Sequence, residues 1–356
     1  MPNIVFLPLI TAFILTVFAA PLSLVFIRKL GILDDPNRKH PAILHKNPVP
    51  RADRIPLFIG IIGASLIFLP ITNMTIALFV TSFIALVIGV LDDKYDISPY
   101  IRFCFNILCA IIIVNNGVSI PFITNPFGGI LHLDTIQTPF GILEQIGLNV
   151  GNLIAIVWLV WIVNMLNWSK GVDGQMPGIV AISAAVIGIL SLRFPLSDPN
   201  TFVAATLSFI ITGSSLGFLL FNFYPAKIFP GYGATSVYLL LGTVSILSGS
   251  KLATAMLVMG VPMIDGAMTI ARRIITGHSP FRHDNKHLHH LLLQLGFGQR
   301  KIALSYWMLS AILGMIALSL ESRGKLFAIT MIVLVIGGGI LFLHFILREN
   351  NEKKNI

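Results

Sequence analysis

The sequence predicts an all-α polytopic membrane protein with about eleven transmembrane helices, its N-terminus outside and its C-terminus in the cytoplasm. Of its 356 residues, 55% are hydrophobic and only 11% are charged, and the mean hydropathy is +0.87. A soluble protein carries roughly 25% charged residues, so a water-soluble globule is excluded. The two cysteines, Cys104 and Cys109, lie in one apolar run, which excludes a disulfide framework and a cysteine metal site.

Apolar stretches long enough to cross a bilayer recur along the whole chain. They cover residues 4–27, 55–72, 74–91, 101–118, 151–167, 177–193, 201–221, 233–250, 252–271, 302–320 and 326–347. The first has no basic residue before its apolar run and is longer than the core of a signal peptide, so we expect a retained span. The 119–150 connection alternates apolar and polar residues around Gly128 and Gly129, which predicts a small β-hairpin at the outer membrane surface.

The charged residues predict the orientation. If the 28–54 connection is cytoplasmic, 20 of the 24 Lys and Arg residues fall on that side, the pattern known as positive-inside. Eleven of the 15 acidic residues fall there too, although acids contribute little to orientation. The chemistry is therefore expected at the cytoplasmic face of a single integral membrane domain, 1–356. The loops expected to form the site are 28–54, 92–100, 168–176, 222–232 and 272–301.

The first candidate motif is Leu91-Asp92-Asp93-Lys94-Tyr95-Asp96, which follows an apolar span. Adjacent carboxylates repel one another unless a cation is near. Mg²⁺ suits oxygen ligands from one or two carboxylates together with substrate phosphates. The alternative interpretation is a solvated loop whose acids cap the next helix.

The second motif runs from Asn164 to Gly174 and reads NMLNWSKGVDG. Asn164 and Asn167 are three residues apart and lie on one helical face. Amides buried at the end of a span need partners, and a nucleotide base or sugar could supply them. Gly171 and Gly174 flank Asp173 in a backbone that can approach a phosphate closely. Ordinary glycine caps at a helix end are the alternative.

The third motif follows the ninth span, with histidines at His287, His289 and His290 after Arg282 and Asp284. Asp265 lies inside the preceding apolar run, and an intramembrane carboxylate is functional by default. The histidine spacing is superficially that of a zinc site, but no cysteine or glutamate joins it. Binding of a diphosphate by Arg and His fits better. A basic interfacial loop that contacts lipid head groups is the alternative.

Together with the first cytoplasmic loop, these motifs resemble the polyprenyl-phosphate N-acetylhexosamine-1-phosphate transferases of glycosyltransferase family 4. The resemblance runs from about residue 31 to 300, and the closing loop resembles the N-acetylglucosamine-phosphate branch more than the muramoyl-pentapeptide branch. The matching residues are Asp34-Asp35-Pro36-Asn37, His45 to Arg51, Asp92-Asp93, Asn164, Asn167, Gly171, Asp173, Gly174, Ser279-Pro280-Phe281, Asp284, His287, His289 and His290.

The resemblance implies a phosphoryl transfer from a UDP-N-acetylhexosamine to a polyprenyl phosphate in the membrane, with UMP released and Mg²⁺ as cofactor. Such enzymes start peptidoglycan, teichoic-acid and lipopolysaccharide O-antigen intermediates. It implies catalytic and metal-supporting roles for Asp92, Asp93 and Asp173. The substrate-binding residues it implies are His45, Arg51, Asn164, Asn167, Arg282, His287, His289 and His290. No nucleic-acid partner is expected, and the sequence leaves monomer and homodimer open.

The chain departs from the family pattern at acidic positions. Lys170 stands where the family has the first acid of Asp-Gly-x-Asp-Gly, and Tyr232 stands where it has the acid that supplies a principal Mg²⁺ ligand. A tyrosine cannot replace a carboxylate as a Mg²⁺ ligand at neutral pH, and Lys170 could instead neutralise a diphosphate directly. Two hypotheses therefore stay open: an active transferase with altered metal dependence, or a degenerate homologue that binds polyprenyl phosphate or a nucleotide sugar. A transporter ranks third, because the outer face lacks matching polar chemistry.

Overall fold

The computed structural model describes residues 2–30, 33–34, 49–50, 54–125, 128–136, 149–247, 252–282 and 284–354, and it is nearly all helical over them. The long helices are α1 (Pro2–Leu30), α3 (Asn73–Tyr95), α6 (Val150–Trp168), α8 (Pro199–Asn222), α13 (Gln299–Ser319) and α14 (Ser322–Lys354). The shorter helices are α2 (Arg54–Phe68), α4 (Pro99–Asn115), α7 (Gln175–Ser191), α9 (Thr235–Leu247), α10 (Leu252–Val258), α11 (Gly260–Ile275), α12 (Leu288–Gln294) and the 3₁₀ turn η1 (Tyr232–Ala234).

The helices fit a membrane. Within the described ranges, six helices are long and apolar enough to cross a bilayer, and the bent pair α10–α11 would make a seventh. Four further apolar helices, α2, α4, α7 and α9, are shorter. The outer surface of α1 and α14 carries exposed side chains such as Phe18, Leu22 and Phe327. An apolar surface of this kind is stable in lipid and costly in water, so the chain is an all-α polytopic membrane protein.

Local sequence explains where several helices begin. Thr72 caps α3 through the backbone N–H of Thr75, and the Thr75 hydroxyl accepts from the backbone N–H of Thr72 in return. Asp198 caps α8 in the same way through Thr201, with Pro199 at the first helical position. Each helix start therefore has acceptors for N–H groups that the helix itself leaves unpaired.

The structure differs from the sequence prediction at the ninth apolar stretch, 252–271. Instead of one straight helix it holds α10 and α11, bent by 85° at Met259. Pro262 explains the break, because a proline has no N–H to donate and its ring clashes with the carbonyl four residues earlier, that of Val258. As a result α11 lies across the bundle rather than along it, and it carries Asp265 toward the histidine loop.

The interior of the bundle is formed by α7, α8 and α9, with α1, α2 and α8 in close contact. Gly213 of α8 lets α1 approach closely, because a Cβ there would lie 2.0 Å from the carbonyl oxygen of Leu9. Beside it the Thr16 and Ser214 hydroxyls form a buried hydrogen bond of 2.8 Å. Small and hydroxylated residues at helix contacts are typical of membrane helices, which gain little from hydrophobic association in lipid.

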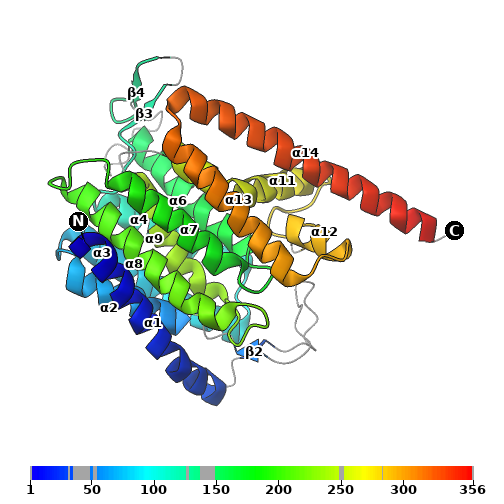
Figure 1. Cartoon of the computed structure of the whole chain (residues 1–356), viewed down its shortest axis with the longest axis horizontal. Helices are drawn as coiled ribbons and strands as arrows, with labels where there is room; N and C mark the ends of the chain where they lie inside the picture. The colour runs from blue at the N-terminus through cyan, green and yellow to red at the C-terminus, as the bar shows by residue number, and fades with distance from the viewer. Residues whose placement is uncertain are drawn as a thin grey trace.

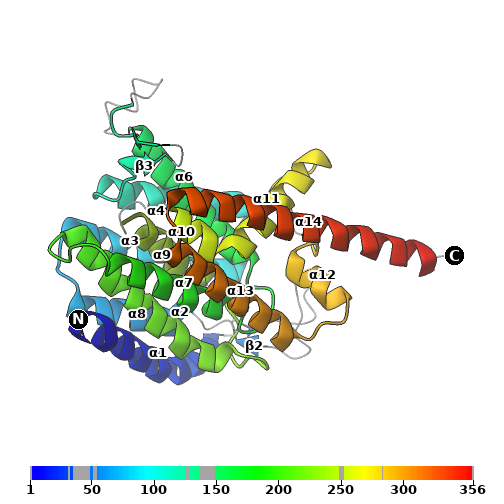
Figure 2. The same cartoon turned by 45° about the horizontal axis from the view of Figure 1, so that its top comes forward.

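Short strands lie outside the bundle. β3 (Phe122–Thr124) and β4 (Ile130–His132) pair antiparallel within the 119–150 connection, with Ile123 opposite Leu131. A second pair joins β1 (Leu33–Asp34) and β2 (Val49–Pro50). In Figures 1 and 2 the β3–β4 pair and the α13–α14 turn lie at one end of the bundle, while β2 and α12 lie at the other. The expected site loops therefore lie at the end opposite the hairpin.

Candidate active site

The paired aspartates lie inside a helix end. The sequence analysis placed them in a loop after the span, but α3 continues to Tyr95, and Asp92 and Asp93 are both buried. Both carboxylate oxygens of Asp92 accept hydrogen bonds from Nη1 of Arg102, at 3.0 and 2.9 Å. The chain turns sharply after them, at Asp96, which adopts a left-handed backbone with φ of 53°. An ion pair between α3 and α4 thus fixes the first motif.

Tyr232 lies at the centre of a cluster of cations and amides. The Cζ atom of Arg102 is 4.9 Å from the centre of its ring, and Nζ of Lys170 is 6.0 Å from it. Nδ2 of Asn106 donates to the phenol oxygen at 3.0 Å. Burial raises the pKa of Tyr232 to about 12, so the phenol is neutral at physiological pH. The cluster joins α3, α4, η1 and the end of α6.

Lys170 connects the second motif to the segment before α9. Its Nζ donates to the carbonyl oxygen of Gly231 at 2.9 Å and to Oδ1 of Asn167 at 3.3 Å. Nδ2 of Asn167 donates to Oγ1 of Thr235 at 3.2 Å, and to the carbonyl of its own helix at Val163. The ammonium is therefore fixed among oxygens from two distant parts of the chain.

Asp173 of the second motif is buried. Its Oδ2 accepts from the backbone N–H of Ala226 at 2.9 Å. The next residue, Gly174, has φ of +79°, and its N–H donates to Oδ1 of Asn222 at 3.0 Å. A side chain is strained in this backbone, so the glycine permits the tight entry into α7. These contacts fix Asp173 against the connection that follows α8.

The three histidines form one buried group at the start of α12. The rings of His287 and His289 are stacked with an angle of 4° between them, and the centres of His289 and His290 are 4.2 Å apart. His289 lies directly on the backbone of Gly171, where a Cβ would be 1.9 Å from its Nε2. Gly171 therefore allows the third motif to contact the second.

Burial sets the charge of these rings. It lowers the pKa of His289 well below its usual value, and the neighbouring His290 and His287 lower it further. Burial and His287 likewise lower the pKa of His290 to about 4. Both rings are neutral at physiological pH and act as hydrogen-bonding groups rather than as cations. Among the described residues, neither ring nitrogen of His289 has a hydrogen-bond partner.

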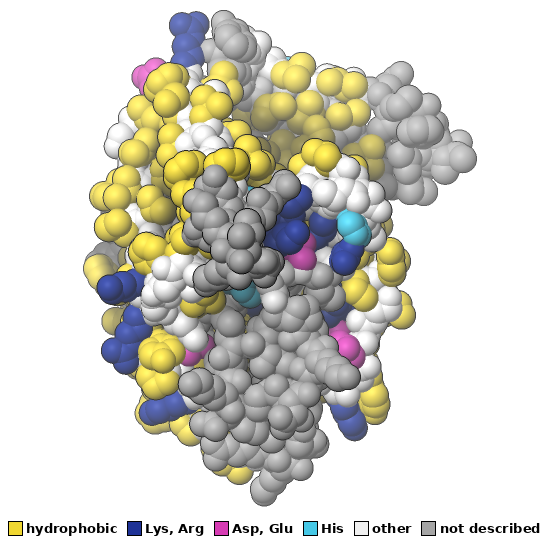
Figure 3. All heavy atoms as spheres, turned by 90° about the vertical axis from the view of Figure 1, so that its right-hand side faces the viewer, with side chains coloured by type: hydrophobic (Ala, Val, Ile, Leu, Met, Phe, Trp, Pro, Cys, Tyr) yellow, Lys and Arg dark blue, Asp and Glu magenta, His cyan; other side chains and the backbone are white. Residues whose placement is uncertain are grey.

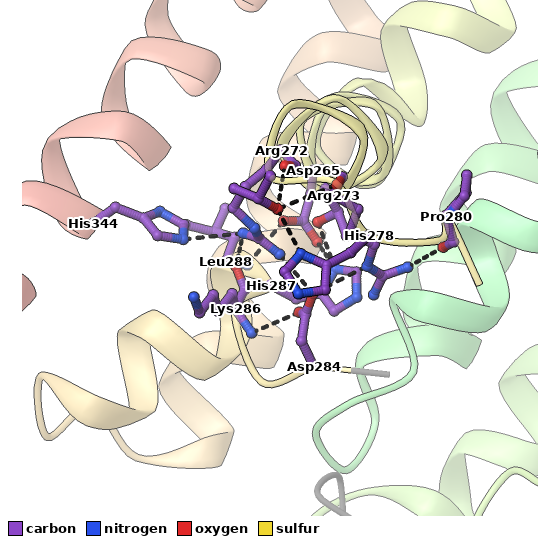
Figure 4. A network of polar contacts seen from close by, with 12 residues as sticks. Asp265, Arg272, Arg273, His278, Pro280, Asp284, Lys286, His287, Leu288 and His344 are labelled. Carbon is purple, nitrogen blue, oxygen red and sulfur yellow. Dashed lines mark hydrogen bonds and ion pairs between the residues drawn. The ribbon is translucent and has the colours of Figure 1, made fainter. Parts of the chain in front are cut away.

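Asp265 of α11 fixes the position of the histidine loop (Figure 4). Its Oδ2 lies 3.0 Å from Nδ1 of His287, and its Oδ1 accepts from the backbone N–H of Leu288 at 2.9 Å. Oγ1 of Thr269 lies 3.3 Å from the same nitrogen of His287. With Asp265 and His287 both buried, the carboxylate fixes the position of the ring and the start of α12 together.

Two arginines of α11 bind the loop that precedes the histidines. Nη2 of Arg272 and Nε of Arg273 lie 2.9 and 3.0 Å from Oδ2 of Asp284 (Figure 4). Burial acts to raise the pKa of Asp284, but the hydrogen bond and charge of Arg273, with the help of Arg272, lower it to about 2. Arg273 also lies over the ring of Trp168, 5.7 Å from its centre, which connects this network to the second motif.

Aromatic rings bring the same loop beside the first motif. Phe281 packs between Tyr100 and Phe103 of α4, with ring centres 5.0 and 5.2 Å away. The Tyr100 hydroxyl lies 3.3 Å from Oγ of Ser279. The contacts from Asp92 through Tyr232 and Lys170 to His289, and back through Phe281, place the three main motifs in one site. Figure 3, seen from this end of the bundle, shows Lys, Arg, Asp, Glu and His side chains gathered between hydrophobic flanks.

The other predicted substrate-binding residues differ in how the structure places them. Asn164 is half-buried, and its Nδ2 donates to the carbonyl of Val160 in its own helix. Arg282 is exposed. His45 and Arg51 lie outside the described residues.

The described donors do not fit a divalent cation. No three His, Cys, Asp or Glu side chains among the residues that the structure describes are placed to share a metal ion. Both oxygens of Asp92 already contact Arg102. A divalent cation about 4 Å from the Lys170 ammonium would be repelled by roughly 8 kcal/mol at an effective dielectric constant of about 20. The neutral phenol of Tyr232 offers no charge to offset this repulsion.

Comparison with known proteins gives the family. The profile of glycosyl transferase family 4 matches residues 75–249. The chain is 31% identical over 310 residues to the probable undecaprenyl-phosphate N-acetylglucosaminyl 1-phosphate transferase of Bacillus subtilis, covering 83% of this chain and 78% of the relative. The chain belongs to glycosyl transferase family 4.

Two further relatives agree with this family 4 assignment. The decaprenyl-phosphate N-acetylglucosaminephosphotransferase of Mycobacterium leprae is 30% identical over 325 residues, covering 83% of this chain and 78% of the relative. The undecaprenyl-phosphate alpha-N-acetylglucosaminyl 1-phosphate transferase of Haemophilus influenzae is 29% identical over 349 residues, covering 93% and 91%. The resemblance read from the motifs is confirmed.

Sequence reasoning missed Arg102 as a site residue. It was counted only as a cytoplasmic charge, yet it begins an otherwise apolar stretch, 101–118. The rule that singled out Asp265, that a charge within a span is functional by default, would have found it. Arg273 and Trp168 carried no comparable signal, because their contact depends on the bend between α10 and α11.

Proposed function

We propose that this chain transfers N-acetylhexosamine 1-phosphate, with N-acetylglucosamine 1-phosphate as the preferred candidate, from a UDP-sugar to a polyprenyl phosphate. An oxygen of the lipid phosphate attacks the sugar-bearing β-phosphorus, and a bond to that phosphorus forms. The bond between the β-phosphorus and the bridging oxygen breaks, and UMP leaves with that oxygen. The observation that carries the proposal is the continuous set of contacts from Asp92 to His289, and the activities named for the family 4 relatives support it.

The residues divide this work by their charge. Arg102, fixed by Asp92, is proposed to neutralise charge on the transferring phosphoryl group. Asp93, the buried neighbour of Asp92, would activate the lipid phosphate as an acid–base group by accepting its proton, and Asp173 would face the nucleotide. The neutral rings of His289 and His290 would hydrogen-bond the diphosphate or sugar. Phosphoryl transfer needs mainly positioning and electrostatic stabilisation, which a fixed polar cluster at a helix-bundle end can supply.

The proposed setting is the cell (inner) membrane, with eleven crossings and the site at the cytoplasmic face. The 20-to-4 distribution of basic residues supports this orientation. Reporters fused after residues 96, 173 and 285 should all report cytoplasm, and those after 135 and 323 the outside. A periplasmic signal at residue 285 would contradict this topology, because it would separate the histidine loop from the aspartates.

The activity test is UMP release by the purified protein with polyprenyl phosphate and a panel of UDP-N-acetylhexosamines. Asp93→Asn should reduce turnover about 10²-fold or more, in keeping with loss of a positioned acid–base group. Asp134→Asn is the matched control, because Asp134 is exposed beside the β3–β4 pair. Absence of UMP from every donor, or an unchanged Asp93→Asn variant, would contradict the proposal.

A degenerate homologue is the second candidate function. The motif resemblance favours it, because it implies acids in the family at the positions of Lys170 and Tyr232. Such a protein would bind polyprenyl phosphate or a nucleotide sugar without turnover. Binding of either ligand with no UMP release under any condition would establish it.

A further inference from the structure

The Lys170 ammonium is surrounded by carbonyl oxygen atoms. Its Nζ donates to the carbonyl oxygen of Gly231 at 2.9 Å and to the amide oxygen of Asn167 at 3.3 Å. Backbone and amide carbonyl oxygens are also the neutral ligands that hard cations choose in proteins. The ammonium thus has the surroundings of a bound cation, although it is attached to the chain by its own side chain.

A second fixed cation lies near the same phenol ring. Arg102 and Lys170 are 4.9 and 6.0 Å from the centre of the Tyr232 ring. Asp92 holds the guanidinium, and the ring between α4 and the second motif adds no charge, since the buried phenol stays neutral. Two fixed cations beside one neutral ring are suited to an anionic ligand such as a diphosphate.

We propose that Lys170, together with Arg102 around Tyr232, binds the diphosphate of the nucleotide sugar in place of a divalent cation, so that this chain needs no added metal. The inference rests on the proposed function and extends it to the cofactor. A lysine supplies a point charge and up to three hydrogen bonds, and an arginine supplies a planar fork, which together suit a diphosphate. The two cations would then explain why the described donors do not form a site for a divalent metal ion.

The test compares turnover with and without divalent metal. Wild-type UMP release should change less than about twofold between excess Mg²⁺ and excess EDTA, and Mn²⁺ titration followed by electron paramagnetic resonance should show no saturable site. Lys170→Met should reduce kcat/KM about 10²-fold or more, a range typical of a lost electrostatic donor. Arg193→Met, an exposed cation between α7 and α8 and outside the predicted site loops, is the control and should behave as wild type. Turnover abolished by EDTA and restored by Mg²⁺, or an unimpaired Lys170→Met variant, would overturn the inference.

A direct binding measurement separates this inference from the proposed function. If no UMP is released, the transferase proposal fails, and calorimetry with UDP-N-acetylglucosamine in EDTA decides the cation question alone. Binding in EDTA that Lys170→Met weakens at least tenfold, and Arg193→Met does not, supports the inference. Binding that requires Mg²⁺, that ignores Lys170, or that is absent, overturns it. The variant Lys170→Arg, which keeps the charge, tests folding and should retain binding.

Discussion

Asp265 offers the sharpest test of how the histidine loop works. Its buried carboxylate accepts from the Leu288 N–H at 2.9 Å and lies 3.0 Å from Nδ1 of His287. A carboxylate accepts only, so it favours the ring form with the proton on Nδ1 and leaves Nε2 as an acceptor. Replacing Asp265 by Asn keeps the shape and the acceptor for Leu288, but its NH₂ group would favour the opposite tautomer.

The magnitudes for two substitutions differ in a useful way. A hydrogen bond to a charged group contributes about 1.5–3 kcal/mol, so Asp265→Ala, which loses both contacts, should destabilise the fold by about 3–6 kcal/mol. Asp265→Asn loses only the charge and one correct donor–acceptor match, and should cost about 1–2 kcal/mol. Turnover should nevertheless fall at least tenfold in the Asn variant, because the proton on His287 is on the wrong nitrogen.

The assay combines thermal unfolding in detergent with UMP release across pH. Asp265→Asn should show a small loss of melting temperature, a large loss of kcat and a displaced pH–rate profile, while KM changes little. Thr269→Val removes the weaker 3.3 Å contact to the same nitrogen and serves as the matched control. An Asn variant with turnover within twofold of wild type would refute the argument. So would an Asn variant as unstable as the Ala variant, since the carboxylate would then be purely structural.

Two further predictions follow from contacts in the site. Gly171→Ala should abolish turnover, because its Cβ would lie 1.9 Å from Nε2 of His289 in the interior. The control Gly338→Ala places a methyl group in open space on α14 and should leave turnover unchanged. Equal activity of the two variants would contradict the packing of Gly171 against His289. The ion pairs that lower the pKa of Asp284 to about 2 should stabilise the loop above pH 4, and this contribution should be lost as the pH falls from about 4 to 2. Pepsin digestion of wild type and Asp284→Asn at each pH measures it; the two should differ most above pH 4 and converge near pH 2, and a constant difference would contradict the prediction.

The helices could be predicted from the sequence because each apolar stretch is bounded by its own local signals. Thr72 and Thr75 cap α3, and Asp198 and Pro199 begin α8, so those starts follow from the sequence alone. The end of α3 could not be placed this way. Asp92 and Asp93 look like loop residues, and the pairing of Asp92 with Arg102 offsets the cost of burying the Asp92 carboxylate at a helix end.

The sequence predicted residues of the site but not the contacts between them. The motifs identified Asp92, Asp173 and the histidines, yet no spacing rule relates Gly171 to His289, which are 118 residues apart in the sequence. Their contact depends on the bend at Met259 and on the absence of a side chain at residue 171, because a Cβ there would clash with His289.

Lys170 and Tyr232 are expected to act together on metal binding. Each alone would damage a metal site, since the lysine adds a repelling charge and the tyrosine removes a ligand. In the structure both belong to one cluster, with Lys170 hydrogen-bonded to the carbonyl of Gly231, the residue before Tyr232, and with Arg102 near the same ring.

Restoring one acid should therefore be worse than restoring both. Lys170→Asp alone should lose turnover without gaining metal dependence, because it removes a cation and leaves a neutral phenol beside the new carboxylate. Lys170→Asp with Tyr232→Asp should recover turnover that requires Mg²⁺, measured as UMP release against Mg²⁺ concentration. A double variant that is inactive at every Mg²⁺ concentration, while it still binds UDP-N-acetylglucosamine, would show that the two positions do not act as a unit.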